Sequence, residues 1–265
     1  MSNEVTIVTA FVDIGRGHWE GVKNNQLIPP YIKRDTSTYF QRFARLAELK
    51  NNIVCFTETK FFEDILKIRD DITLVSIDSV FDDHSHLINK IEHVQQHPSF
   101  IKFVTRPASP EYWSSKYVTI NMMKSHFCSY AVEKGLSKTG TSAWIDFGYV
   151  RDDTFCPPGM LWKFNDQGKI NIFCNTPFTH NEPIFEIIRT GEVIIQGCHV
   201  VCPDLKWKHL SQMINESMSA MFECGLIDDD QTALLMAYRK YTEYFVCNHG
   251  DPSNWFTIFK NYQHD

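Results

Sequence analysis

The segment Trp144-Ile-Asp-Phe-Gly148 carries the most informative acidic residue of the chain. Its apolar start is typical of a buried strand, and Asp146 would stand where that strand ends. The carboxyl ends of strands in open α/β sheets border the crevice in which such proteins bind ligands. We therefore expect Asp146 to face a ligand. The simpler alternative is an aspartate that only ends a strand and caps the following turn.

Three polar side chains precede that strand at helical spacing. Tyr117, Asn121 and Lys124 are four and three residues apart, which places them on one face of a helix. The amide of Asn121 is suited to bonding a base or a ribose, and Lys124 could offset the charge of a diphosphate. The competing interpretation is that Lys124 is an ordinary surface lysine. Lys116 lies on a different face and is a weaker candidate.

Arg16 stands between two glycines directly after the first apolar run of the chain. That run predicts a buried strand whose end includes Thr9, Ala10 and Phe11, and the glycines would let the backbone approach a ligand closely. The pattern matches neither the dinucleotide-binding G-x-G-x-x-G nor the Walker A motif, so NAD binding and ATP hydrolysis are not favoured. A surface ion pair is the alternative role for Arg16.

Three adjacent aspartates, Asp228, Asp229 and Asp230, precede a helical pattern near the C-terminus. Acidic residues stabilise helix N-termini, so Asp228 or Asp229 is expected to cap this helix. A carboxylate at such a place could also act as a general base that takes the proton of a hydroxyl group. Asp230 is our first candidate for that base and Asp229 our second.

Two further candidates follow in a late segment rich in turn-forming residues. His249 is a candidate metal ligand, since imidazole commonly binds metals, although a histidine beside a turn is more often structural. Trp255 offers a flat apolar face of the kind that packs against a sugar ring or a base.

These candidates need a sheet to position them, and strand-like runs alternate with helix-like segments over the first half of the chain. That alternation predicts a parallel sheet. Strands are expected at residues 5–11, 53–56, 72–77, 142–148, 160–164, 169–174, 192–201 and 242–247. Helices are expected at residues 36–49, 60–69, 111–134, 205–224 and 229–240. We find no domain boundary, so the sequence predicts one α/β domain whose first half is doubly wound and whose second half is mixed.

Composition limits the classes of function. With 43% hydrophobic and 14% aromatic residues in 265, the chain has the make-up of a folded globular protein. Its formal net charge of -6 argues against a nucleic-acid partner. No apolar run approaches the roughly 18–20 residues of a membrane span, no secretory signal is recognisable, and the cysteines lack paired C-x-x-C spacing. These features favour a cytoplasmic location, in which any association with a membrane would be peripheral.

Taken together, several of these segments resemble the HtrL/YibB family. The resemblance spans nearly the whole chain and includes the opening T-A-F-x-D-I-G-R-G-x-W, the central W-I-D-F-G, the Gln196-Gly197 turn and Asp229-Asp-Gln231. Members of the family are associated with the assembly of bacterial lipopolysaccharide or related polysaccharides, and the layout is similar to GT-A glycosyltransferases. The resemblance thus implies a single GT-A-like domain over residues 1–265, with a Rossmann-like mixed sheet flanked by helices. Residues 1–150 would bind a nucleotide sugar, and residues 151–265 would bind a glycan or glycolipid acceptor and carry the catalytic groups.

The resemblance also implies roles for individual residues. Asp230 and Asp229 would be catalytic. The acceptor or its sugar would meet Gln196, Gly197, Gln231 and Trp255. The donor would meet Thr9, Ala10, Phe11, Arg16, Asn121, Lys124, Asp146 and Gly148.

A divalent ion is the cofactor to consider. GT-A enzymes place a D-x-D element here, whose carboxylates meet the ribose and a metal ion, whereas this chain has D-x-G because Gly148 takes the third position. Asp146 and His249 would then hold Mn²⁺ or Mg²⁺. In a metal-independent version, Lys124 and Arg16 would neutralise the donor instead.

Two other classes of function remain open. The missing second aspartate is compatible with a non-catalytic glycan- or nucleotide-binding protein on the same fold. A metal-dependent hydrolase that uses the acidic cluster is weaker, because the eleven histidines are dispersed.

Overall fold

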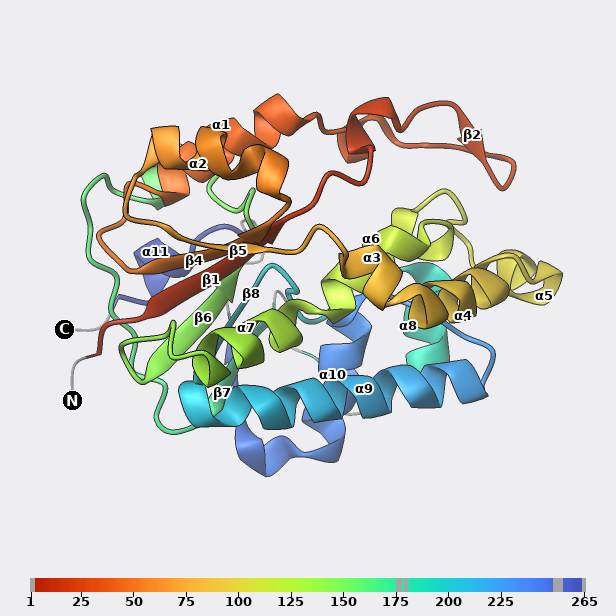
Figure 1. Cartoon of the computed structure of the whole chain (residues 1–265). Helices are drawn as coiled ribbons and strands as arrows, with labels where there is room; N and C mark the ends of the chain where they lie inside the picture. The colour runs from red at the N-terminus through yellow and green to blue at the C-terminus, as the bar shows by residue number, and fades with distance from the viewer. Residues whose placement is uncertain (1–2, 175–177, 179–180, 250–254, 264–265) are drawn as a thin grey trace.

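The computed structural model describes residues 3–174, 178, 181–249 and 255–263. At its centre is a seven-stranded sheet of order β5-β4-β1-β6-β8-β7-β9 (Figure 1). The expected α/β class, with a mixed sheet flanked by helices in a single domain, is confirmed. The strands are β1 (Thr6–Phe11), β4 (Ile53–Thr57), β5 (Thr73–Ser76), β6 (Thr141–Ile145), β7 (Ile170–Cys174), β8 (His199–Pro203) and β9 (Phe245–His249).

Strand direction divides the sheet into a parallel part and a mixed part. β5, β4, β1 and β6 run parallel to one another. β8 is antiparallel to both of its neighbours, β6 and β7, whereas β7 and β9 are parallel. The chain places β4 and β5 on one side of β1 and then returns to place β6 on the other. The strand order therefore reverses between β1 and β6, and ligands of open α/β sheets bind outside the carboxyl ends of strands at such a point.

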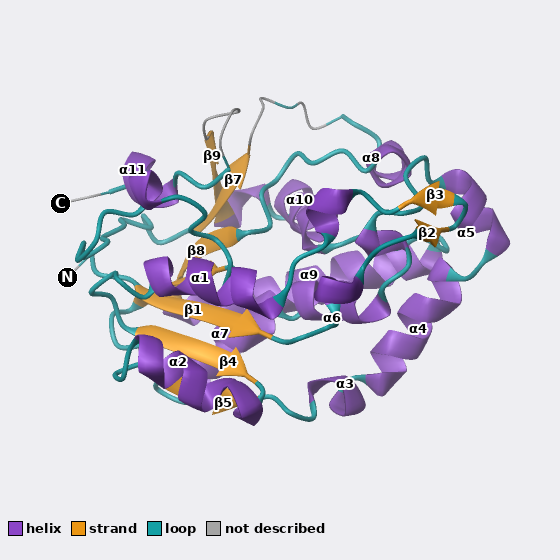
Figure 2. Cartoon of the chain, turned by 90° about the horizontal axis from the view of Figure 1, so that it is seen from above, coloured by secondary structure: helices purple, strands orange, loops and turns teal. Residues whose placement is uncertain are grey.

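Helices cover both faces of the sheet (Figures 1 and 2). Because both faces are covered, β1 is apolar almost throughout, with Ile7 and Phe11 packed in one hydrophobic cluster and Val8 in the other. One face carries α1 (Thr36–Leu46), α2 (Phe62–Ile68) and α11 (Ile258–Asn261). The opposite face carries α7 (Lys124–Glu133), α9 (Trp207–Glu223) and α10 (Asp230–Lys240).

The other helices extend the molecule beyond one end of the sheet (Figure 2). A short hairpin of β2 (Val22–Lys23) and β3 (Gln26–Leu27) projects above this extension (Figure 1). Periodicity in the sequence predicted no elements over most of this region. The extension comprises α3 (Val80–Asp83), α4 (Ser85–Gln95), α5 (Pro98–Phe103), α6 (Ser115–Met122) and α8 (Ile184–Thr190).

The strand expected at residues 160–164 is wrong. This segment forms only an isolated bridge between Lys163 and Glu4. The reason is the buried side chain of Asn51, whose Oδ1 accepts from the backbone N of Trp162 at 2.8 Å and whose Nδ2 donates to the carbonyl of Trp162 at 2.8 Å. One amide thus satisfies the backbone groups that a neighbouring strand would otherwise bond.

Two other elements are shorter than expected. The strand expected at residues 192–201 begins only at His199, and before it Ile195 makes a single bridge to Cys174. The helix expected at residues 111–134 is interrupted at Met123, where α6 ends and α7 begins. The interruption lets α6 pack against α4 and α7 pack against α9 and β1.

None of the described helices combines the length and the apolar character that crossing a bilayer requires.

Candidate functional site

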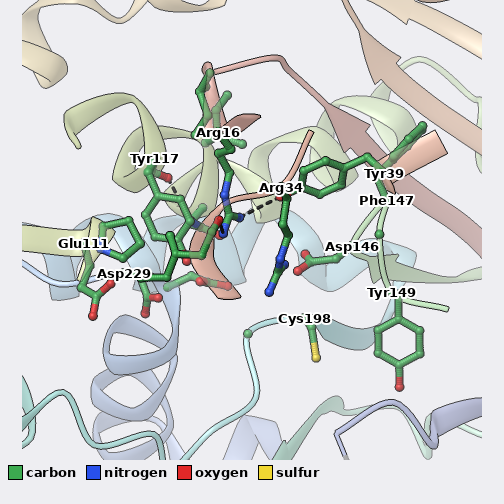
Figure 3. Close-up of a pocket in the computed structure, with 18 of the residues that line it drawn as sticks. Arg16, Arg34, Tyr39, Glu111, Tyr117, Asp146, Phe147, Tyr149, Cys198 and Asp229 are labelled. Atoms are coloured by element: carbon green, nitrogen blue, oxygen red, sulfur yellow. Dashed lines mark hydrogen bonds between the residues drawn. The ribbon is translucent and has the colours of Figure 1, made fainter. Parts of the chain in front are cut away.

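A cavity of about 420 Å³ lies at the carboxyl ends of β1 and β6. Three elements that the sequence analysis singled out meet in its wall. The end of β1 and the following loop contribute Ala10, Phe11 and Arg16. Residues Asn121 and Lys124 come from α6 and α7, and Tyr117 accompanies them. The segment after β6 contributes Asp146 and Gly148. Figure 3 shows the side chains that project into this space.

Lys124 joins two of the predicted acidic residues at the base of the cavity. Its Nζ lies 3.1 Å from Oδ1 of Asp146 and 2.9 Å from Oδ2 of Asp230, and it donates to the carbonyl oxygen of Gly197 at 2.8 Å. Oδ1 of Asp146 also accepts from the indole Nε1 of Trp144 at 2.8 Å. The three oxygen atoms around Nζ match the three donors of an ammonium group.

Burial makes this ion pair electrostatically strong. The side chain of Lys124 is 11% exposed and that of Asp230 is 7% exposed, whereas that of Asp146 is 39% exposed. Burial alone would lower the pKa of Lys124, but the charges of Asp146 and Asp230 outweigh it and raise that pKa above its ordinary value. Burial raises the pKa of Asp230 to about 6, and Lys124 limits the rise. Lys124 is therefore a permanent cation, and the surface-lysine interpretation is wrong.

Gly197 permits the close approach of Asp230. A Cβ atom at position 197 would lie 2.5 Å from Oδ2 and 2.8 Å from Cγ of Asp230. Any side chain at this position would displace the carboxylate from Lys124. The Gly197 expected in the acceptor site therefore contributes its backbone carbonyl and the space that its missing side chain leaves.

Asp229 caps α10, as expected for one of the adjacent aspartates. Its Oδ1 accepts from the backbone N of Gln231 at 3.0 Å, and its side chain also lines the cavity. Asp228 is turned to structural partners, since its Oδ1 accepts from the N of Asp229 at 2.9 Å and its Oδ2 from Thr232 Oγ1 at 2.7 Å. Burial, and then the charges of Asp230 and Asp228, raise the pKa of Asp229 well above its ordinary value.

Glu111 is a cavity residue that the sequence analysis missed. Figure 3 shows its carboxylate at the same end of the cavity as that of Asp229. Burial, and then the charge of Asp229, raise the pKa of Glu111 from 4.5 to about 8. Arg106 and Arg16 oppose this rise. No short-range motif marked Glu111, because its position beside α10 follows from helix packing.

Hydrogen bonds and aromatic rings hold Arg16 at the cavity wall. Its Nη1 donates to the hydroxyl of Tyr39 at 2.7 Å, and its Nη2 donates to the carbonyl of Ile32 at 2.9 Å. The guanidinium carbon lies 5.2 Å from the ring centroid of Trp19 and 5.6 Å from that of Tyr117. Hydrogen bonds and cation–π contacts thus orient a cation whose charge no acidic side chain within the described residues pairs with.

Besides Arg106, two more cavity arginines, Arg34 and Arg151, were not found from the sequence. Arg34 follows a short 3₁₀ helix before α1 and points into the cavity on the side of Asp146 (Figure 3). Arg151 follows β6, and its guanidinium carbon lies 3.8 Å from the ring centroid of Phe256. Neither stands in a recognisable motif, so the only available signal was that each lies a few residues from a predicted strand or helix end.

The remaining expected residues divide between the cavity and its surroundings. Gln231 and Trp255 line it. Thr9 and Gln196 are buried and are not among its lining residues. His249 lies in β9, where its Nδ1 is 3.1 Å from Sγ of Cys174, and it too is absent from the lining. Residues 250–254 of the late segment lie outside the described residues.

The donor set does not fit a divalent ion. Oδ1 of Asp146 already contacts an ammonium and an indole N–H, Gly148 supplies no ligand atom, and His249 lies outside the cavity. In the described part of the chain, no group of three or more His, Cys, Asp or Glu residues is arranged to hold a metal ion. The candidate ligands for Mn²⁺ or Mg²⁺ are therefore not brought together.

The fold and the cavity define the class: an α/β protein with a charged cavity at the point where its strand order reverses. The chain belongs to the HtrL/YibB family. A family described as "Bacterial protein of unknown function (HtrL_YibB)" matches residues 3–264. Protein HtrL of Escherichia coli (strain K12) is 31% identical over 268 aligned positions, which cover 98% of this chain and 93% of that protein.

Proposed function

We propose that this protein is a glycosyltransferase that moves a sugar from a nucleotide-sugar donor to a hydroxyl group of a cell-surface glycan. One observation carries the proposal: a single cavity combines the loop after β1, the lysine at the start of α7 and the carboxylate after β6. The mixed sheet supports it, because a parallel half followed by a mixed half agrees with the GT-A-like layout that the sequence resemblance implies. Membership of the HtrL/YibB family is compatible with an acceptor such as lipopolysaccharide or a related polysaccharide.

The charges of the cavity suit the two parts of a nucleotide sugar. The nucleoside would lie against Phe11, Asn121 and Asp146, which offer an aromatic ring, an amide and a half-exposed carboxylate. The diphosphate carries several negative charges in a protein of net charge -6, so cations must face it. One unlike charge pair near a surface is worth up to about 4 kcal/mol at close range. Arg16, Arg34 and Arg151 line the same cavity.

Transfer would proceed by attack of the acceptor hydroxyl oxygen on the anomeric carbon of the donor sugar. The new carbon–oxygen bond forms as the bond from that carbon to the diphosphate breaks, and the nucleoside diphosphate leaves with the bonding electrons. The hydroxyl proton passes to a carboxylate. Asp230 is the first candidate, because a pKa of about 6 leaves it ionised at neutral pH, and Asp229 is the second.

The acceptor would meet two lining residues: Gln231, in the first turn of α10, and Trp255, whose carbonyl accepts from the hydroxyl of Tyr149 at 3.2 Å. The flat ring of Trp255 is suited to a sugar face, and the side chain of Gln231 is suited to its hydroxyl groups. We place the reaction in the cytoplasm or at the inner face of the inner membrane, where nucleotide sugars meet growing glycolipids.

A thermal-shift screen of nucleoside diphosphates and nucleotide sugars tests the proposal, because a ligand that binds the folded state raises its apparent stability. We expect one nucleotide family to shift the midpoint and its sugar derivative to be consumed when a lipopolysaccharide-type acceptor is present. If no nucleotide shifts the midpoint, the proposed donor site is contradicted. Binding without donor consumption across a broad acceptor panel would instead favour a non-catalytic nucleotide- or glycan-binding protein.

A further inference from the structure

Four arginines gather around the side of the cavity that includes Gly148. Arg16, Arg34 and Arg151 line the cavity, and Arg42 of α1 lies behind it, with its Cδ 3.7 Å from the position that a Cβ at Gly148 would take. The backbone N of Arg34 donates to the carbonyl of Arg16 at 3.2 Å, which ties two of them together. We refer to Arg16, Arg34, Arg42 and Arg151 as the arginine cluster.

The charge of this cluster is not neutralised within the described part of the chain. There, the arginines that form ion pairs are Arg45, Arg69, Arg189 and Arg239, and none belongs to the cluster. Nη1 of Arg42 and Nε of Arg16 are buried, and neither has a hydrogen-bond partner among the residues that the structure describes. Buried donors of this kind are costly unless a partner satisfies them. Of these two arginines, Arg16 lines the cavity, where a ligand with several acceptor oxygens would meet it.

Burial, and then repulsion between the arginines of the cluster, lower the pKa values of two of them, Arg42 and Arg151. Loss of hydration and then the charge of Arg34 lower the pKa of Arg42. Partial burial, and then repulsion from Arg34 and Arg42, lower the pKa of Arg151 to about 10. An anion between these side chains would remove the repulsion, so the arrangement is complementary to negative charge.

We infer that the cavity-lining members of the arginine cluster, Arg16, Arg34 and Arg151, form the diphosphate-binding site and neutralise the leaving group without a divalent ion. The inference depends on the proposed function for the identity of the ligand, but the anion site itself does not. Guanidinium groups bind phosphate oxygens through two parallel hydrogen bonds and stay charged at all physiological pH values. Lys124 complements them, because its ammonium already lies 3.1 Å from Asp146, the carboxylate to which a metal ion would bind.

The test is calorimetric titration of the full-length protein with inorganic pyrophosphate and with a panel of nucleoside diphosphates. Each titration is run in excess EDTA and again with Mn²⁺. We expect the affinity to be the same in both conditions. Arg34→Gln and Arg151→Gln should each weaken binding about tenfold or more, as the loss of a charge-assisted hydrogen bond predicts.

Arg189→Gln is the matched control, because Arg189 forms a surface pair with Glu186 on α8 and does not line the cavity. The Arg189→Gln variant should bind diphosphates with the same affinity as the wild type. Arg34→Lys and Arg151→Lys keep the charge and lose the planar fork, so they should bind more weakly than the wild type and more tightly than the glutamine variants. Circular dichroism of each variant identifies any that fails to fold. If a glutamine variant does not fold, the affinity of the corresponding lysine variant tests the inference.

The outcomes separate this inference from the proposed function. Diphosphate binding that requires Mn²⁺, or that is unaffected by the Arg34 and Arg151 variants, overturns the inference and leaves the glycosyltransferase proposal standing. Arginine-dependent binding of pyrophosphate without any preference for a nucleotide supports the anion site and contradicts the nucleotide-sugar donor. No binding of any diphosphate overturns both.

Discussion

The phenol ring of Tyr39 occupies the space into which a side chain at position 148 would project. Cδ1 of Tyr39 would lie 2.9 Å, and Cε1 3.2 Å, from a Cβ at Gly148. Because the hydroxyl of Tyr39 accepts a hydrogen bond from Arg16, this packing also fixes a cavity arginine. The glycine in D-x-G therefore has a steric reason. Tyr39 fills the space that the side chain of a second aspartate would need, and its hydroxyl positions Arg16.

Gly148→Ala should destabilise the protein by about 1–3 kcal/mol, the usual cost of overpacking a filled site. Urea denaturation measures this change in the free energy of unfolding. Gly17→Ala is the control, since its Cβ would approach nothing closer than 3.4 Å. The double variant Gly148→Ala/Tyr39→Ala should cost less than the sum of its two single changes. Additive costs would show that Tyr39 is not the obstacle.

Lys124→Met should destabilise the folded state by about 3–5 kcal/mol, because it leaves the buried carboxylate of Asp230 without its cation. The double variant Lys124→Met/Asp230→Asn should recover part of this loss, which a double-mutant cycle of unfolding free energies quantifies. Lys240→Met breaks the exposed pair of Lys240 with Glu216 and should change stability little. Equal effects of the two lysine substitutions would contradict the burial argument.

Stability should fall as pH rises across the range in which Glu111 ionises. Its pKa is about 8 in the folded protein against an ordinary 4.5, so between these values the folded state binds more protons than the unfolded state. The contribution of Glu111 is thus complete below pH 4.5 and is lost as pH rises through about 8. Unfolding free energies measured across this range should decrease.

Glu111→Gln should flatten that decrease without abolishing it, because Asp228 and Asp229 also have raised pKa values. Glu63→Gln changes an exposed glutamate of α2 and serves as the control. An identical pH slope in wild type and Glu111→Gln would show that Glu111 titrates normally.

If Asp230 is the catalytic base, transfer should slow as pH falls through about 6, because a base must be deprotonated to act. Asp230→Asn should lower kcat about 10²–10⁴-fold and remove this acid limb. Asp229→Asn is the informative comparison, since asparagine caps a helix as well as aspartate and should preserve α10. A large loss of kcat in Asp229→Asn, with Asp230→Asn nearly active, would reverse the assignment.

Local sequence determined the elements that carry the site. Apolar runs fixed the positions of β1, β4, β5 and β6 to within a few residues, because the core strands of a parallel sheet must be apolar on both faces. Helical spacing placed Tyr117, Asn121 and Lys124 on one face, and all three line the cavity even though the helix is interrupted at Met123. The position of Asp146 in the cavity wall was predicted from its place at the end of a strand.

Only the tertiary structure decided which charges meet. Arg34, Arg42 and Arg151 come from a loop, a helix and the segment after a strand, and no short-range pattern records that their side chains converge. No short-range pattern records the ion pair between Lys124 and Asp230 either, or the position of His249 outside the cavity. Periodicity and turn chemistry act over a few residues, so they predict elements. Contacts between distant side chains depend on how those elements pack, and here packing assembled the arginine cluster.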